Sequence, residues 1–311
     1  MTVLLATDAS AEENHTWLRA LSQALPGERF VTSRNAVVDP EIDVAMVANP
    51  ASGSLAGLPS LRLIQSLWAG VNGLLNDASV PADVPLARMV DPAMADAMAQ
   101  TALWAVLGLH RGFYTCARDQ REHRWGMHEQ RRADEVGVTV LGLGQMGNRV
   151  ARSLVREGYR VAGWSQRARS IDSVHCHVGA AALPSLLAQT QILINLLPLT
   201  PATVGLIDMH TLAALPRGAS LVNLARGAHV IEADLLAALD SGHLEHAVLD
   251  VFAIEPLPVE HAFWDHARVT VLPHFAAQTD PRSAAQVAAA NVRALREGRA
   301  LAHLVDRQRG Y

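Results

Sequence analysis

Short apolar runs alternate with amphipathic helical patterns along almost the whole chain, and this alternation restricts the fold more than any other feature. Strands that alternate with helices are typical of βαβ units, whose strands lie parallel in one sheet. The chain is therefore predicted to have an α/β fold. The expected strands cover residues 3–6, 44–48, 63–66, 86–89, 137–143, 160–164, 192–196, 219–223, 247–250 and 268–272, and the expected helices cover residues 12–25, 92–113, 148–157, 232–241 and 283–297.

The strands fall into two series, one on each side of the helix expected at residues 92–113. With 311 residues, the chain has the length of two domains. This helix and the charged segment after it, residues 118–135, are a candidate bridge between them. The final helix has no strand after it, so it is expected to return to the first domain. The sequence thus predicts a discontinuous first domain of residues 1–95 plus 284–311 and a second domain of residues 96–283.

The charged residues exclude several classes of function. All 26 basic residues are arginine, so no lysine is available for a Schiff base or for binding pyridoxal phosphate. The formal net charge is -4 and the isoelectric point is near 6.4, which argues against a nucleic-acid partner. No apolar stretch approaches the roughly 18 residues of a membrane span, so no membrane partner is expected.

Two cysteines, Cys116 and Cys176, are too few for a disulfide framework and suit a reducing compartment. Because the sequence also starts without a cationic leader, the protein is expected to be soluble and cytoplasmic. Cys176 lies between His175 and His177, but alternate residues of an extended segment point to opposite faces. No second ligand cluster follows at zinc-site spacing, so no metal site is predicted.

A glycine-rich loop joins the strand expected at residues 137–143 to the helix after it. Gly142, Gly144 and Gly147 follow the spacing G-x-G-x-x-G, which in this context indicates a dinucleotide site. The three glycines would allow a tight turn, a close approach of the pyrophosphate, and helix–strand packing. The pyrophosphate would rest on the backbone N–H groups at the helix start, around Gln145 and Met146. The alternative is an ordinary glycine turn in a parallel sheet.

The end of the next strand bears on the type of dinucleotide. An NAD-specific site places a carboxylate about 20 residues after the glycine loop, but here the next carboxylate is Asp172. Ser165 and Arg167 or Arg169, with Gln166 between them, suit a ribose phosphate instead. NADP(H) is therefore the preferred cofactor, with NAD(H) possible. The alternative is that these arginines only decorate an exposed loop.

Three polar residues, Arg226, Glu255 and His274, each follow a predicted strand in the second series. Ligands of open α/β sheets bind at the carboxyl ends of the strands. Taken singly, each residue also has an ordinary structural explanation, as a surface arginine, a loop glutamate or a hydrogen-bonded core histidine.

Together with the glycine loop, these segments resemble the D-isomer-specific 2-hydroxyacid dehydrogenases. The motifs that carry this resemblance are Asn223-Leu224-Ala225-Arg226-Gly227, Leu249-Asp250-Val251-Phe252, Glu255-Pro256-Leu257-Pro258 and Pro273-His274. Further stretches are similar to the glyoxylate/hydroxypyruvate reductase A branch of that family: Gln65 to Val71, Leu196 to Pro201, Thr279 to Arg282, and Val305 to Tyr311. The resemblance covers nearly the whole chain.

The resemblance implies two Rossmann-like, doubly wound parallel-sheet domains in a homodimer. Residues 1–95 plus 284–311 would form a flavodoxin-like substrate domain, and residues 96–283 the dinucleotide-binding domain. It also implies roles for individual residues. His274 would donate a proton to the substrate oxygen. Glu255 would fix the orientation of the imidazole and favour its charged form. Arg226 would hold the substrate carboxylate and carbonyl. Trp68, Ala69, Gly70 and Val71 would bind substrate, and Leu197, Pro198, Leu224, Ala225 and Asp250 would contact the cofactor.

The predicted function is the NADPH-dependent reduction of small 2-oxo acids, namely glyoxylate to glycolate and hydroxypyruvate to D-glycerate. One alternative is a related dehydrogenase for larger 2-oxo acids such as 2-ketogluconate or phenylpyruvate. A less favoured alternative is a dinucleotide-sensing protein that keeps the fold without turnover.

Overall fold

The computed structural model describes residues 2–34 and 38–311. The chain forms two compact units, Met1–Met94 with Thr279–Tyr311, and Ala95–Gln278. It passes to the second unit near the start of helix α3 (Pro92–His110) and returns just before helix α9 (Pro281–Arg296). The charged segment 118–135 lies wholly in the second unit, so the prediction that it helps to bridge the domains is wrong.

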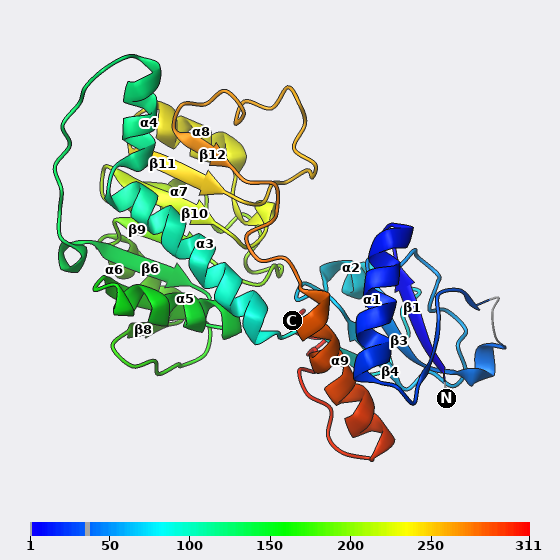
Figure 1. Cartoon of the computed structure of the whole chain (residues 1–311). Helices are drawn as coiled ribbons and strands as arrows, with labels where there is room; N and C mark the ends of the chain where they lie inside the picture. Colours follow the sequence, from blue (N-terminus) through cyan, green and yellow to red (C-terminus); the bar gives the residue numbers. More distant parts are fainter. Residues whose placement is uncertain (1, 35–37) are drawn as a thin grey trace. The chain divides into compact units, whose positions relative to one another are not determined.

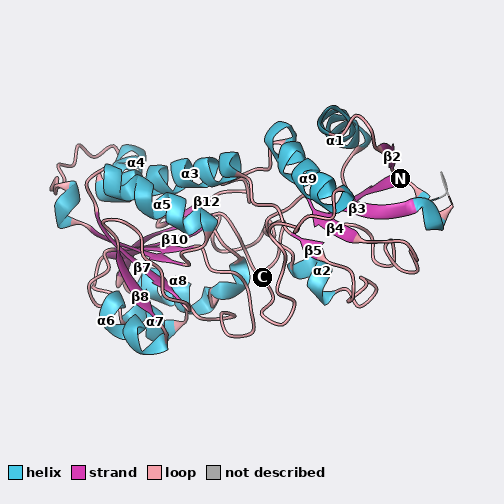
Figure 2. Cartoon of the chain, turned by 90° about the horizontal axis from the view of Figure 1, so that it is seen from below, coloured by secondary structure: helices cyan, strands magenta, loops and turns pink. Residues whose placement is uncertain are grey.

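The first unit is a parallel sheet of five strands in the order β2-β1-β3-β4-β5. Its strands are β1 (Thr2–Thr7), β2 (Arg29–Val31), β3 (Ile42–Ala48), β4 (Leu63–Ser66) and β5 (Leu86–Ala87). Helices α1 (Ala11–Ala24) and α9 cover one face, and the short α2 (Asn72–Asn76) lies on the other (Figure 2). This strand order is that of a doubly wound, flavodoxin-like sheet.

Local signals explain the helices of this unit. Helix α1 begins with a capping box, in which Ser10 and Glu13 each accept a hydrogen bond from the backbone N–H of the other. Its buried face carries Trp17 and Leu21, four residues apart. Helix α9 is tied to the same unit because Arg296 forms ion pairs with Glu28, at 2.7 Å, and with Asp43.

The second unit is a parallel sheet of seven strands in the order β12-β11-β10-β9-β6-β7-β8 (Figure 1). Its strands are β6 (Gly137–Leu141), β7 (Arg160–Ser165), β8 (His175–Val178), β9 (Ile192–Asn195), β10 (Ala219–Asn223), β11 (Leu244–Leu249) and β12 (Val269–Val271). This is the Rossmann strand order with one added edge strand, and the order reverses between β6 and β9. The predicted class, two doubly wound parallel-sheet domains, is confirmed.

Helices cover both faces of the seven-stranded sheet. Helices α3, α4 (Phe113–Arg121) and α5 (Gln145–Arg156) lie on one face, and α6 (Leu183–Leu187), α7 (Met209–Ala213) and α8 (Glu232–Asp240) lie on the other (Figure 2). Side chains along β6 point alternately to the two faces of the sheet. Val138 and Val140 therefore pack in the core beneath α3 and α5, whereas Leu141 packs in the core beneath α6 to α8.

The structure corrects several predicted boundaries. The strand expected to reach residue 143 ends at Leu141, because Gly142 has φ +96° and turns the chain. The helix expected to reach residue 113 ends at His110, and the left-handed Gly112 starts a separate helix, α4. Met89 donates its N–H to Trp68 O, outside the ladder, so β5 ends at Ala87 rather than residue 89.

Two short strands, β2 and β8, escaped prediction because three or four residues carry too little periodicity. Strand β8 contains His175, Cys176 and His177, and no described group of three or more His, Cys, Asp or Glu side chains is arranged to hold a metal ion. Across residues 2–34 and 38–311, every helix is too short or too polar to cross a lipid bilayer.

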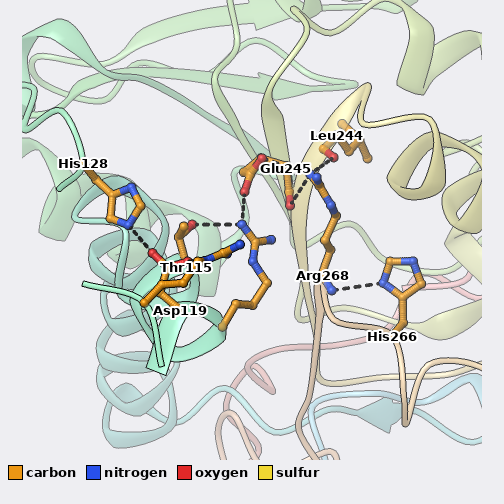
Figure 3. Close-up of polar contacts among 9 residues, drawn as sticks. Thr115, Asp119, His128, Leu244, Glu245, His266 and Arg268 are labelled. Atoms are coloured by element: carbon orange, nitrogen blue, oxygen red, sulfur yellow. Dashed lines mark hydrogen bonds and ion pairs between the residues drawn. The ribbon is translucent and has the colours of Figure 1, made fainter. Parts of the chain in front are cut away.

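Ion pairs fasten α4 and the segment after it to the second unit (Figure 3). The Glu245 carboxylate on β11 binds the guanidinium of Arg118 on α4 at 2.9 Å and that of Arg268 at 3.0 Å. Asp119, also on α4, binds Arg124 at 2.6 Å and His128 at 2.9 Å. The loop that carries residues 124–128 is therefore held back against α4.

Candidate active site

Six parallel strands of the second unit deliver the predicted cofactor and catalytic residues to one edge of the sheet. Each of these residues follows the carboxyl end of its strand, and in a parallel sheet these ends lie together. Gly142 to Gly147 follow β6, Ser165 to Arg167 end or follow β7, Leu197 and Pro198 follow β9, Leu224 to Arg226 follow β10, Asp250 and Glu255 follow β11, and His274 follows β12.

The glycine loop after β6 combines two packing requirements with one open position. A Cβ atom on Gly147 would lie 1.8 Å from the carbonyl oxygen of Gly142, and one on Gly142 would lie 2.6 Å from that of Leu196. Gly144, which caps α5, has an ordinary φ of -72°, and apart from its two chain neighbours no described residue has an atom within 4 Å of its Cβ position. The fold therefore needs glycine at positions 142 and 147, whereas Gly144 leaves room for a ligand at the helix start.

The end of β7 offers positive charge near this loop. Arg167 is exposed, and no carboxylate of the described chain pairs with it. The Ser165 hydroxyl donates a hydrogen bond to the backbone oxygen of Arg167 at 2.7 Å, which tightens the turn. Gln166, between them, is exposed as well. The turn suits a phosphate group, because a guanidinium and a hydroxyl face solvent without an acidic competitor.

His274 and Glu255 form a short polar contact. The distance from His274 Nδ1 to Glu255 Oε2 is 2.6 Å, and Glu255 Oε1 accepts the backbone N–H of Phe252 at 2.9 Å. Because Nδ1 donates to a carboxylate, Nε2 is the ring nitrogen left for a substrate. The backbone of His274 has φ +53°, a left-handed conformation that turns the chain as it leaves β12.

Arg226 lies within electrostatic range of this pair. Burial lowers the pKa of Arg226, and the Glu255 carboxylate opposes that shift. The loop position is fixed by Gly227, where a Cβ atom would lie 1.8 Å from the backbone carbon of Phe252. The structure thus brings the Arg226 loop against the same backbone segment that holds Glu255.

Asp250 is buried and binds the segment that carries the histidine. Its carboxylate accepts the backbone N–H of Phe275 at 2.9 Å and that of Ala276 at 3.1 Å. Burial raises the pKa of Asp250, and these two N–H groups and His274 act against the increase. Asp250 therefore holds the chain directly after His274, in addition to the cofactor contact expected of it.

A buried polar network was missed in the sequence. Asn195 Nδ2 donates to Asn223 Oδ1 at 3.0 Å and lies 3.0 Å from His229 Nδ1, while His229 Nε2 lies 3.3 Å from the oxygen of Pro198. Asn223 Nδ2 in turn donates to the backbone oxygen of Arg226 at 3.1 Å. Burial, the largest influence, lowers the pKa of His229, which keeps its ring neutral. The network joins the loops after β9 and β10.

One signal in the sequence pointed to this network. Asn195 and Asn223 are the last residues of two neighbouring, otherwise apolar strands, and a buried amide at a strand end needs a partner. Nothing in the sequence identified His229 as that partner, because the pairing depends on how the η5 turn (Gly227–His229) folds back.

The predicted substrate loop belongs to the first unit and is described there. Trp68, Ala69, Gly70 and Val71 directly follow β4, and Trp68 packs edge-on against Trp17 with ring centroids 6.2 Å apart. The Ser66 hydroxyl and the backbone of Trp68 exchange hydrogen bonds at 2.9 and 3.1 Å. The loop borders a recess of about 180 Å³ in this unit, which Gly70 and Trp68 help to line.

Comparison with known proteins identifies the family. The family described as "D-isomer specific 2-hydroxyacid dehydrogenase, NAD binding domain" matches residues 103–276. A protein of Serratia proteamaculans named glyoxylate/hydroxypyruvate reductase A is 41% identical over 307 residues, which is 97% of each chain. The corresponding protein of Yersinia enterocolitica is 38% identical over 304 residues, 96% of this chain and 97% of that one.

Two solved structures have the same fold over their full length. A D-isomer specific 2-hydroxyacid dehydrogenase from Xanthobacter autotrophicus, in complex with NADPH and MES, has a TM-score of 0.95 and 40% identity, with 99% of each chain covered. An NADPH-dependent glyoxylate/hydroxypyruvate reductase from Sinorhizobium meliloti, in complex with NADP and sulfate, has a TM-score of 0.91 and 33% identity, with 100% of this chain and 99% of that one covered. The chain therefore belongs to the D-isomer-specific 2-hydroxyacid dehydrogenase family, in the branch of the relatives named glyoxylate/hydroxypyruvate reductase A.

Proposed function

We propose that the protein is an NADPH-dependent reductase that converts glyoxylate to glycolate and hydroxypyruvate to D-glycerate. The observation that carries the proposal is the 2.6 Å contact between His274 and Glu255 beside Arg226, at the same sheet edge as an open glycine loop. The family is one of oxidoreductases, and relatives that cover the full chain are named for this reaction.

The residues at the sheet edge fit an NADPH molecule. The first N–H groups of α5, around Gly144, Gln145 and Met146, would hold the pyrophosphate, because a helix N-terminus attracts anions and Gly144 leaves space. Ser165, Gln166 and Arg167 would hold the ribose phosphate. The nicotinamide half would lie against the loops that contain Leu197, Pro198, Leu224, Ala225 and Asp250. When bound, NADPH supplies the hydride that reduces the substrate carbon.

The three polar side chains account for the rest of the reaction. Arg226 binds the substrate carboxylate and carbonyl oxygen, and its positive charge stabilises the negative charge that grows on this oxygen. His274, as an imidazolium, donates the proton on Nε2 to the oxygen and becomes neutral. Glu255 holds Nδ1, so the ring keeps its orientation throughout. The products are a 2-hydroxy acid and a neutral imidazole, which water reprotonates.

The two domains would divide the binding of the two ligands. We assign the dinucleotide to residues 96–283 and the substrate acid to residues 1–95 plus 284–311. In the latter, the backbone N–H groups of Ala69, Gly70 and Val71 would bind the carboxylate, and Trp68 would shape the pocket. A loop after a parallel strand suits this task, since its N–H groups have no partner within the sheet.

A panel of 2-oxo acids, run separately with NADPH and NADH while absorbance at the nicotinamide band is recorded, tests the proposal. We expect turnover of glyoxylate and hydroxypyruvate, with NADPH the better cofactor. Faster turnover of 2-ketogluconate or phenylpyruvate would assign a different substrate class. Absence of turnover with every acid, despite tight NADPH binding, would contradict an enzymatic role.

We further propose that two copies associate through the surface of α3, α4 and the loop after α4. Large apolar side chains face solvent there: Trp104, Phe113, Trp125 and Met127 are 47%, 59%, 96% and 88% exposed. The Asp119 ion pairs hold the loop that carries Trp125 and Met127 in place (Figure 3). Association of two copies would therefore lose less conformational entropy than it would with a flexible loop.

Sedimentation of the wild type and the double variant W125D/M127D tests this association. We expect a dimer that becomes a monomer in the variant, whereas Val259→Asp, at an apolar position that is 91% exposed, should leave the dimer intact. A wild-type monomer would contradict the proposal.

The unpaired cysteines Cys116 and Cys176 support a reducing compartment, and we place the enzyme in the cytoplasm.

A further inference from the structure

Arg88 differs from the other arginines in combining partial burial with an unpaired guanidinium. No hydrogen bond or ion pair joins its side chain to any residue within 2–34 and 38–311. The other arginines whose side chains lack such a partner in the described chain are all exposed, namely Arg19, Arg62, Arg121, Arg156, Arg167 and Arg169. Solvent accounts for those six, but not for Arg88.

The fold gains nothing from a charge in this place. Removing a guanidinium from water costs free energy unless an anion or several acceptors replace the water. Burial lowers the pKa of Arg88, and no acidic group opposes the shift. The titratable group that faces it is His303, a base, whose own pKa is lowered by burial and then by Arg88. An unpaired, partly buried cation in a stable fold points to a ligand that provides the anion.

The position of Arg88 indicates which ligand. It directly follows β5, at the carboxyl end of the strand, and β5 pairs with β4, which leads into Trp68. The next residue, Met89, donates its N–H to the oxygen of Trp68 at 3.1 Å. On its other side, Arg88 donates its own N–H to the oxygen of His303 at 3.0 Å. The backbone of Arg88 is therefore fixed beside the start of the 68–71 loop, at the sheet edge where ligands bind.

We propose that Arg88 is a substrate-binding residue of the first unit, which holds the carboxylate of the 2-oxo acid together with the N–H groups of the 68–71 loop. This inference rests on the proposed function and deepens it. A planar guanidinium forms paired hydrogen bonds with a carboxylate, and in a chain without lysine only arginine can provide such a charge.

The test compares Arg88→Gln, Arg88→Met and Arg88→Lys with Arg62→Gln, a matched control at an exposed, unpaired arginine of the same unit. The measurements are the KM and kcat for glyoxylate and hydroxypyruvate, the dissociation constants of NADPH and of oxalate as a non-reacting anion, and the thermal midpoint. For R88Q and R88M, we expect the KM and the oxalate constant to rise about 10- to 100-fold, since a charged hydrogen bond is lost. We expect kcat and NADPH binding to change little, and R88K to recover part of the affinity.

The thermal midpoint separates binding from structure. If Arg88 is kept for a ligand, Arg88→Met should unfold at the same or a higher temperature than the wild type, because it removes an uncompensated, partly buried charge. A lower midpoint with an unchanged KM would overturn the proposal, as would R88Q kinetics equal to those of R62Q. If the wild type turns over neither acid but binds oxalate through Arg88, the proposed reaction fails and the anion site stands.

Discussion

Glu255 Oε2 lies 2.6 Å from His274 Nδ1, although the two side chains come from loops after different strands of the sheet. The second carboxylate oxygen is held by the N–H of Phe252, so the pair is anchored to the backbone at one end. This arrangement fixes the ring and leaves Nε2 for the substrate.

Replacing Glu255 with glutamine tests the charge of this partner without changing its size. We expect kcat for glyoxylate to fall by about 10²-fold or more, because the amide does not stabilise the imidazolium. NADPH should bind as before, which fluorescence titration of the coenzyme measures. Glu260→Gln, an exposed glutamate of the same loop, is the control and should keep wild-type kinetics. Equal kcat values for the two variants would contradict the role of Glu255.

The open Cβ position at Gly144 leads to a second prediction. Alanine fits there without strain in the free protein, since φ is -72° and, apart from the two chain neighbours, no atom of residues 2–34 and 38–311 lies within 4 Å of the added methyl group. A methyl group would nevertheless occupy the space assigned to the pyrophosphate. Gly144→Ala should therefore keep the thermal midpoint and weaken NADPH binding by at least about tenfold, or 1.4 kcal/mol. Gly27→Ala, at another open position, should change neither quantity. Unaltered NADPH binding in G144A would remove the pyrophosphate from this loop.

The buried His229 should affect catalysis only by positioning the loops that carry Arg226 and Pro198. Leucine at this site removes the contacts of His229 with Asn195 Nδ2 and with the oxygen of Pro198, which weakens the link between the loops after β9 and β10. We expect kcat/KM to fall about 10- to 100-fold in His229→Leu, because a displacement near 1 Å at a reacting group has effects of this size. His229→Gln retains a donor and an acceptor and should recover part of the loss. Identical kinetics for the two variants would show that the network does not position Arg226.

Stability should depend on pH through a histidine outside the active site. His246 stacks on Tyr114 with ring centroids 4.4 Å apart, and burial, with smaller contributions from Arg118, His266 and Arg268, lowers the pKa of His246 to about 3. In the unfolded chain this ring titrates near 6.5, so the unfolded state binds more protons between the two values. The free energy of unfolding should therefore be highest above pH 6.5 and fall by up to about 1.4 kcal/mol per pH unit below it.

Denaturant titrations of His246→Phe between pH 7 and about 4.5 measure this dependence. Phenylalanine keeps the ring stack but cannot bind a proton, so the slope should decrease by up to one proton. The exposed His175, changed to phenylalanine, is the control and should retain the wild-type slope. If the slope of H246F matches that of the control, His246 is not responsible for the loss of stability in acid.

The repeating pattern of strands and helices was sufficient to predict an α/β fold with parallel strands, because burial on both faces makes parallel strands continuous apolar runs. That both domains are doubly wound was implied by the family resemblance. The glycine spacing predicted the loop after β6 for a physical reason that the structure shows at Gly142 and Gly147, where a side chain would collide with backbone. The short strands β2 and β8 were not predictable, since their three and four residues pair only because neighbouring strands already exist.

Residues at the candidate site differed in how far sequence could identify them. Arg226, Glu255 and His274 were predictable because each follows a strand of one parallel sheet, so topology alone brings them to one edge. His229 and Arg88 were not, because their importance lies in burial and in the presence or absence of partners. Those properties depend on three-dimensional packing between segments that are distant in the sequence.

Proton donation by His274 is the central step of the proposed mechanism, and His274→Ala compared with the wild type tests this step directly. The measurement is NADPH consumption with saturating glyoxylate, together with NADPH binding in the absence of the acid. We predict that the variant binds NADPH like the wild type and loses turnover by about 10²- to 10⁴-fold. Undiminished turnover in the variant, with either glyoxylate or hydroxypyruvate, would contradict the assignment of the acid and with it the proposed mechanism.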